Sequence, residues 1–220
     1  LATMVRFGGI TFLPFYLQVA AGIGVDESGL YLLPLMIGIV VSAVASGRLV
    51  ARTGRYRIFP VAGLALAAAS FLVFAAVGRA EPGSGLITFL TTVGLGLGMV
   101  MPILTVCVQN AVERSDLGAA TSSLAFFRSI GGAVGVALFG AVLANGLERF
   151  LPETLSPAAR ARLLDGGPLH GGRLAGAFQG QVADAFVDSY RIVFAAAGTV
   201  CVLAWLAALS VRELVLRREP

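Results

Sequence analysis

The chain has 220 residues, of which 57% are hydrophobic and only 13% are charged, and its mean hydropathy is +0.89. Soluble domains carry about 25% charged residues, so this composition excludes an ordinary soluble protein and indicates a membrane protein. All sixteen basic residues are arginine, and the formal net charge is +4.

Six segments are long and apolar enough to cross a bilayer as helices, because ~20 residues at ~1.5 Å each cover ~30 Å of hydrocarbon. They are residues 3–22, 29–50, 58–78, 85–108, 119–144 and 188–211. The runs lack the alternation of barrel strands, so we predict an all-α, polytopic membrane protein. Residues 145–187 form the one long connection, in which Ser156 and Pro157 favour the start of a short helix.

The first two segments carry polar or small residues within apolar runs. Gln18 lies at the outer end of the first segment, and we interpret it as a weak candidate for a cavity or gate. In the second segment Gly38, Ser42 and Ser46 recur every four residues, a spacing typical of close helix packing. A second interpretation is that such faces slide during a conformational cycle.

The connection after the second segment, "GRLVARTGRYR" (47–57), holds four arginines and no acid. Arginines of short loops gather on the cytoplasmic side. One side of the predicted bundle receives a single loop arginine, Arg79, and the other receives eight: Arg48, Arg52, Arg55, Arg57, Arg114, Arg212, Arg217 and Arg218.

This asymmetry predicts the orientation of the chain. We expect a multi-pass protein of the plasma (inner) membrane, with both chain ends cytoplasmic and the loop 145–187 extracytoplasmic. Arg6, which we place near the cytoplasmic end of the first segment, agrees. Topology and contact with the lipid bilayer explain the positive charge, so we predict no nucleic-acid partner.

The fourth segment places Pro102, Thr105 and Gln109 near one face, together with Thr91 and Gly98. Pro102 removes a backbone hydrogen bond and should bend the helix. The bend is either purely structural or lines a cavity, since neighbours or water must satisfy the carbonyl groups that it frees.

The fifth segment carries Arg128 about nine residues from its start. A central arginine costs ~2.5–3.5 kcal/mol on insertion scales, so its position needs a reason. It either extends to the cytoplasmic headgroups or serves a cavity or gate. Gly131, Gly132 and Gly135 follow on the same face and predict helix packing. A second set of small residues also predicts close packing: Thr121, Ala125, Ser129, Ala133, Ala137 and Ala141.

No catalytic constellation is visible in the sequence. Cys107 and Cys201 lie singly in apolar runs, and His170 lies in a glycine-rich stretch, so we expect no metal, no cofactor and no enzyme activity. Every acid falls in a connection, the tail or a helix end. If transport is proton-driven, we expect the embedded carboxylate outside this sequence.

Four stretches together resemble the C-terminal half of a major facilitator superfamily transporter, most like the fourteen-helix drug:proton antiporter (multidrug efflux) branch. They are residues 12–34, 47–57, 94–112 and 117–140. The second resembles the superfamily's cytoplasmic motif G-x-L-x-D-R-x-G-R-[KR], and the matching positions are Gly47, Leu49, Arg52, Gly54 and Arg55. The acidic position of that motif is Ala51 here.

The resemblance implies one six-helix bundle of a secondary transporter that exports small amphipathic or cationic compounds in exchange for protons. Its partners would be a small-molecule substrate, protons and the N-terminal half of the same transporter, which we expect to lie outside this sequence. The motif residues would then act in gating at the cytoplasmic side. Two alternatives remain: a carrier of the same fold for a non-drug metabolite, and a membrane subunit without transport activity.

Overall fold

The computed structural model describes residues 1–19, 23–77, 83–151 and 179–210, and in these ranges the chain is helical and contains no strand. The helices are α1 (Ala2–Met4), η1 (Val5–Gly9), α2 (Leu13–Val19), α3 (Val25–Thr53), α4 (Ile58–Val77), α5 (Ser84–Gly98), α6 (Val100–Asn110), η2 (Arg114–Asp116), α7 (Leu117–Phe150) and α9 (Gln179–Leu209). The all-α class is confirmed. The helix predicted at Ser156 lies outside the described residues.

Five stretches within the described ranges are long and apolar enough to cross a membrane. They are Glu27–Thr53, Ile58–Val77, Ser84–Asn110, Arg114–Phe150 and Gly180–Leu209. The first of the six predicted spans is present as three short helical pieces, because a turn of π-helix at η1 and an irregular residue at Phe12 interrupt it. The count of six is therefore approximate.

Several helices are longer than the sequence pattern indicates. α7 continues to Phe150 and α9 begins at Gln179, so both ends of the predicted connection 145–187 are helical. These extra turns are stabilised by burial, since Leu147, Val182 and Phe186 all lie in the core. α3 likewise continues to Thr53, where Gly54 ends it in the left-handed conformation with a φ of 71°.

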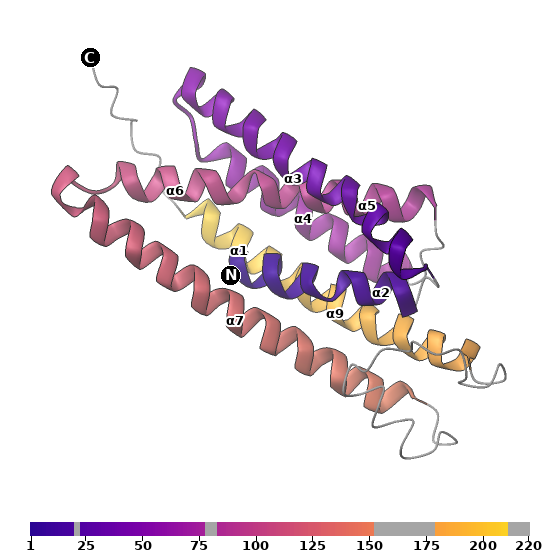
Figure 1. Ribbon diagram of the computed structural model, residues 1–220. Helices are drawn as coiled ribbons and strands as arrows, with labels where there is room; N and C mark the ends of the chain where they lie inside the picture. The colour runs from indigo at the N-terminus through magenta and orange to yellow at the C-terminus, as the bar shows by residue number, and fades with distance from the viewer. Residues whose placement is uncertain (20–22, 78–82, 152–178, 211–220) are drawn as a thin grey trace.

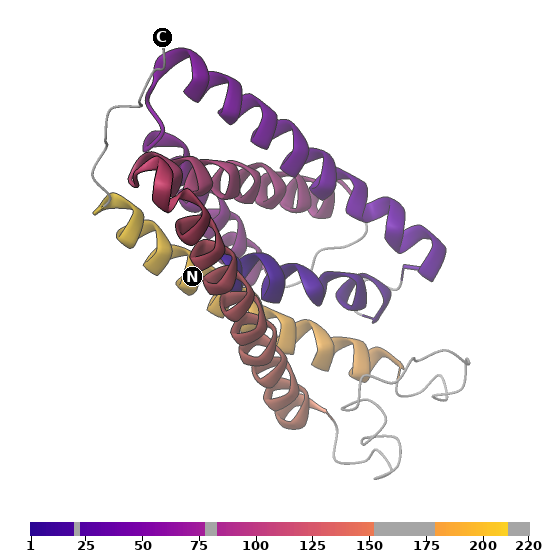
Figure 2. The same ribbon diagram turned by 60° about the vertical axis from the view of Figure 1, so that its left-hand side comes forward.

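The helices form an elongated bundle (Figure 1). α4 packs against α9 and α5, α3 packs against α5, and α7 packs against α9 and η1. The broken first helix, α1–η1–α2, runs between α3 and α7 in both views, beside α9 (Figure 1, Figure 2). The first described residues lie midway along the bundle rather than at one of its ends.

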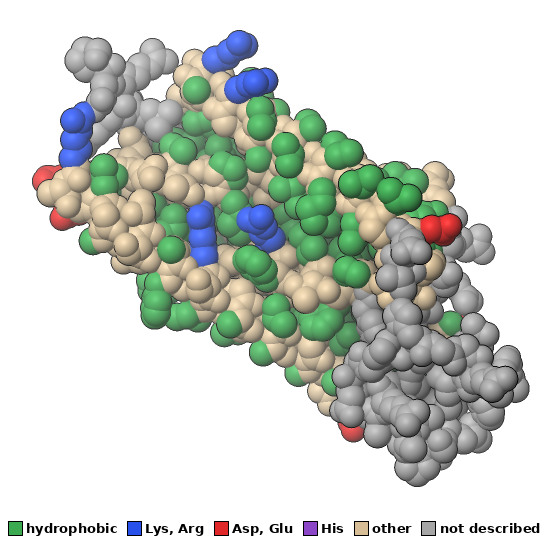
Figure 3. Space-filling model, viewed as in Figure 1, with side chains coloured by type: hydrophobic (Ala, Val, Ile, Leu, Met, Phe, Trp, Pro, Cys, Tyr) green, Lys and Arg blue, Asp and Glu red, His purple; other side chains and the backbone are tan. Residues whose placement is uncertain are grey.

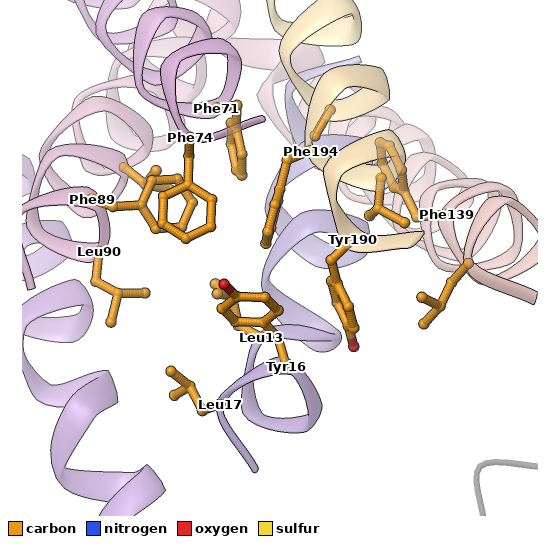
Figure 4. Close-up of a cluster of buried hydrophobic side chains, with 14 of the residues drawn as sticks. Leu13, Tyr16, Leu17, Phe71, Phe74, Phe89, Leu90, Phe139, Tyr190 and Phe194 are labelled. Carbon is orange, nitrogen blue, oxygen red and sulfur yellow. The ribbon is translucent and has the colours of Figure 1, made fainter. Parts of the chain in front are cut away.

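An aromatic cluster fills the core on the side toward α4 and α9 (Figure 4). Tyr16 of α2 meets Tyr190 of α9 with ring centroids 5.0 Å apart. Phe74 stacks on Phe89, and Phe194 contacts both rings edge-on. Edge-to-face and offset contacts are the favoured arrangements of aromatic pairs. The cluster ties α2, α4, α5 and α9 together.

Glycines allow two pairs of helices to approach closely. A Cβ atom on Gly38 of α3 would lie 2.9 Å from the carbonyl oxygen of Thr91, and one on Gly135 of α7 would lie 2.5 Å from that of Met4. No side chain fits at either position. The predicted close packing of α3 at Gly38 and Ser42 is confirmed, since a Cβ on Gly98 of α5 would overlap Ser42.

The second small-residue stripe behaves differently. Most of the set Thr121, Ala125, Ser129, Ala133, Ala137 and Ala141 is exposed, so the prediction that this stripe packs within the bundle is wrong. α7 instead buries Gly132, Gly135, Phe139, Leu143 and Gly146. The glycines on that face fit the π-helical turn of η1 more closely than alanines could.

Candidate functional site

The helix formed by α5 and α6 is interrupted at Met99, between Gly98 and Val100. The cause lies in the next turn. Pro102 has no amide hydrogen, and its ring would clash with the carbonyl group of Gly98, four residues earlier. Met99, three residues before Pro102, keeps helical dihedral angles of φ −70° and ψ −21°, so the structure shows a one-residue interruption of the α-helix and the bend itself stays a prediction.

Arg128 of α7 reaches this irregular region. Its Nη2 donates hydrogen bonds to the carbonyl oxygen of Met101, at 2.9 Å, and to Oγ1 of Thr105, at 2.8 Å. The Thr105 hydroxyl in turn donates to the Met101 carbonyl, at 3.1 Å. The three groups close a triangle that joins α6 to α7. We refer to Arg128, Met101 and Thr105 as the arginine triangle.

The triangle satisfies only part of the guanidinium group. Nε of Arg128 is buried and has no hydrogen-bond partner among the described residues. Both acceptors are neutral, so the triangle positions the positive charge without compensating it. Arg128 lies eleven residues after the start of α7, or ~17 Å along its axis at ~1.5 Å per residue.

The three glycines that follow Arg128 lie against the first helix. A Cβ atom on Gly131 would lie 3.4 Å from Cβ of Thr3, and one on Gly132 would lie 3.1 Å from the ring of Phe7. Together with the approach of Gly135 to Met4, these contacts place α1 and η1 directly beside the turn of α7 that carries Arg128. The sequence placed Arg128 and the glycines on one face, whereas the arginine side chain bonds to α6 and the glycines contact α1–η1.

Arg6 lies in the same region, which the sequence analysis did not anticipate. We predicted it near the cytoplasmic end of its helix. Instead η1 lies beside the middle of α7, next to the turn that follows Arg128. The sequence does not predict that Arg6 and Arg128 lie in one region, because no motif links them and only the packing of η1 on α7 brings them together. The prediction of orientation therefore depends on the other arginines.

The two glutamines lie elsewhere. Nε2 of Gln18 donates to Oγ of Ser28, at 3.3 Å, and this bond joins α2 to the start of α3. Gln109 is exposed in the last turn of α6. Among the described residues neither glutamine bonds to Arg128, whereas Thr105 does, and Pro102 directly follows Met101, whose carbonyl oxygen accepts from Arg128.

The arginine motif lies at the end of the bundle where α3 turns into α4. Gly47, Leu49 and Arg52 are part of α3, whereas Gly54 and Arg55 belong to the tight turn that follows. Thr53 Oγ1 donates to the carbonyl of Leu49 at 2.7 Å. Arg57 donates to the carbonyl of Leu209, so it ties this turn to the last residue of α9. An arginine suits this place, because the carbonyl end of a helix is electronegative.

Comparison with known proteins gives a consistent result. The family model described as Major Facilitator Superfamily matches residues 1–136. An uncharacterized MFS-type transporter of Mycobacterium tuberculosis is 37% identical over 209 residues, which cover 95% of this chain and 30% of that protein. The multidrug transporter protein MdtP of Bacillus subtilis is 37% identical over 153 residues, 69% of this chain and 28% of that protein.

A third relative is named for a specific resistance. The tetracycline resistance determinant of Streptomyces rimosus is 29% identical over 235 residues, which cover 94% of this chain and 68% of that protein. The chain thus spans less than a third of the length of the first two relatives.

Proposed function

The chain belongs to the major facilitator superfamily and is part of a multi-pass membrane transporter rather than an enzyme. From this premise we propose that it forms the C-terminal bundle of a proton-coupled exporter of small amphipathic compounds. Transporters of this type work by alternating access, in which two helix bundles rock about a binding site near the middle of the membrane. The partner bundle would be the N-terminal half of the same transporter. Small-molecule substrate and protons would be its other partners.

The arginine triangle is the observation that carries this proposal. A guanidinium group whose hydrogen-bond acceptors are neutral is energetically unfavourable inside a membrane. A bundle with a purely structural role would gain no stability from such a charge. Irregular backbone at membrane depth is tolerated where it is covered by protein or lines a cavity. We therefore assign the triangle to the cavity or gate of the transporter.

The names of the relatives support the export of drugs. One is called a multidrug transporter and another a tetracycline resistance determinant. The surface of the described bundle agrees with amphipathic cargo, because apolar side chains are spread over the face that carries basic side chains at its middle (Figure 3). A carrier of strongly hydrophilic metabolites would need more polar groups on this face.

Proton coupling needs a carboxylate or histidine within the membrane. Of the acids that the structure describes, Glu148 lies near the end of α7, whereas Asp184 and Asp188 lie five and nine residues after the start of α9, inside the apolar stretch Gly180–Leu209. The expectation that every acid lies in a connection or at a helix end is therefore wrong for α9. Asp188 is 47% exposed and pairs with Arg191, so we do not assign it to proton coupling. We place the coupling carboxylate in the part of the transporter that this sequence does not include. The cytoplasmic motif residues Gly47, Leu49, Arg52, Gly54 and Arg55 would act at the gate on the side of the α3–α4 turn.

Reconstitution of the full-length transporter tests this proposal. Proteoliposomes would be loaded with a fluorescent amphipathic dye, and an imposed proton gradient should accelerate its movement against its own gradient at least several-fold. Empty liposomes provide the control. Dye movement that an ionophore collapsing the gradient leaves unchanged would exclude proton coupling, and absence of any protein-dependent movement would exclude drug export.

A further inference from the structure

Two arginines of like charge lie beside each other near the middle of the bundle. Arg6 is part of η1, whose neighbour Phe7 contacts α7 at Gly132, and Arg128 lies one turn before that glycine. The turn of η1 that carries Arg6 packs on the turn of α7 that follows Arg128, so the two positive charges lie in one region of the bundle, where like charges repel each other. In Figure 3 basic side chains stand in the middle of a face over which apolar side chains are spread, far from the acidic side chains visible at its ends.

Neither arginine is compensated by an acid within the described part of the chain. Arg128 has the neutral partners Met101 and Thr105, and its Nε has no partner. Arg6 has its guanidinium carbon 5.9 Å from the centroid of the Phe7 ring. The ion pair between Arg191 and Asp188 lies on α9, away from both arginines, and is about half exposed.

Two uncompensated positive charges in one region favour the binding of an anion between them. Each uncompensated arginine is unfavourable at membrane depth, and their mutual repulsion adds to that cost. One carboxylate between them would remove both penalties at once. Guanidinium groups also match carboxylates geometrically, since their planar N–H donors bind two oxygens in parallel.

We propose that Arg6 and Arg128 together bind one carboxylate during transport, an inference that rests on the proposed export function and narrows its substrate class. The apolar surroundings suit the body of an amphipathic acid or zwitterion, and Phe7, which is 49% exposed beside Arg6, offers an aromatic surface to it. The arginine triangle holds Arg128 in place, and its unpartnered Nε remains as a further donor. The carboxylate belongs either to the cargo or to another segment of the same transporter.

A matched pair of dyes separates these two sources. An aminoxanthene dye with a free carboxylate and its methyl ester differ in that one group. Export of both would be measured in vesicles that contain the full-length transporter, for the wild type and for the variants Arg6→Gln and Arg128→Gln. Arg149→Gln, which removes an exposed arginine at the far end of the same helix, is the control at equal membrane level.

If the cargo supplies the carboxylate, each variant lowers export of the free acid by about tenfold or more and changes that of the ester by less than about twofold, in line with a lost charged hydrogen bond. If the transporter supplies it, both dyes slow equally and the pH dependence of export shifts. Export of both dyes that remains at the wild-type level, or equal slowing with an unshifted pH profile, would overturn the proposal. Failure of the wild type to export either dye would instead contradict the proposed function itself.

Discussion

Arg128 donates a hydrogen bond of 2.8 Å from Nη2 to Oγ1 of Thr105, across the contact between α7 and α6. The same threonine hydroxyl donates to the Met101 carbonyl. Thr105 therefore links a charged side chain to the backbone of an interrupted helix. Because the hydrogen-bond partners of Arg128 are neutral, this contact fixes the position of an uncompensated positive charge.

Loss of the Thr105 hydroxyl should weaken that positioning. Thr105→Val keeps the size and removes both hydrogen bonds, whereas Arg128 retains its bond to Met101. We expect export to fall about fivefold in the full-length transporter, which corresponds to ~1 kcal/mol for one hydrogen bond. Thr105→Ser keeps the hydroxyl group and should remain within about twofold of the wild type. Equal export by all three proteins would show that Thr105 does not position Arg128.

Gly135 is predicted to be intolerant of a side chain. Its Cβ atom would lie 2.5 Å from the Met4 carbonyl oxygen, and backbone cannot move aside easily. Gly135→Ala should therefore destabilise the protein by ~1–3 kcal/mol, the usual cost of overpacking. The matched control is Gly118→Ala in the first turn of the same helix, where the added atom meets nothing within 4 Å.

Thermal unfolding of the purified full-length protein measures both changes. Gly118→Ala should leave the melting temperature unchanged or raise it, because alanine is the better helix former by about 1 kcal/mol. A Gly135→Ala variant as stable as the control would contradict the close contact between α7 and α1.

Tyr190 should stabilise the irregular residue of the first helix. Its hydroxyl donates to the Phe12 carbonyl at 2.8 Å, and the same oxygen also accepts the Tyr16 amide at 3.0 Å. Tyr190→Phe should lower stability by ~0.6–1 kcal/mol, since Phe12 keeps its second partner. Tyr31→Phe on α3 is a suitable comparison, and its effect on thermal unfolding should be smaller. A larger effect at Tyr31 would argue against this role for Tyr190.

The orientation of the bundle can be tested by cysteine labelling. Cysteines would be placed singly at Gly24 and Thr53, with Cys107 and Cys201 replaced by alanine. Because the arginine-rich side should be cytoplasmic, a membrane-impermeant maleimide should label the cysteine at position 24 in intact cells. The one at position 53 should react only after permeabilisation. The reverse pattern would invert the predicted topology.

The sequence was informative about helices and poor at describing contacts between them. Apolar run length located the membrane spans, since crossing ~30 Å of hydrocarbon demands it. Helix ends were missed where burial decides them, as at Leu147 of α7 and Phe186 of α9. The break before Pro102 was anticipated, because the missing amide hydrogen acts locally.

Local pattern could not decide which face of α7 packs inside the bundle. Small residues occur on both sides of that helix, and only the shape of η1 selects Gly132 and Gly135. The sequence predicted one of the two hydrogen-bond partners of Arg128 as a site residue and missed the other. Thr105 was a candidate by its place on α6, whereas the Met101 carbonyl and the nearby Arg6 follow from packing that no periodicity encodes.

The most direct test of the account is the export rate of the Arg128→Ala variant of the full-length transporter, measured at a membrane level equal to that of the wild type. We predict normal insertion and a fall in export of at least about tenfold, because the variant removes the charge that the triangle holds between α6 and α7. Export at the wild-type rate would contradict a role for Arg128 in transport and leave it as a structural link between α6 and α7.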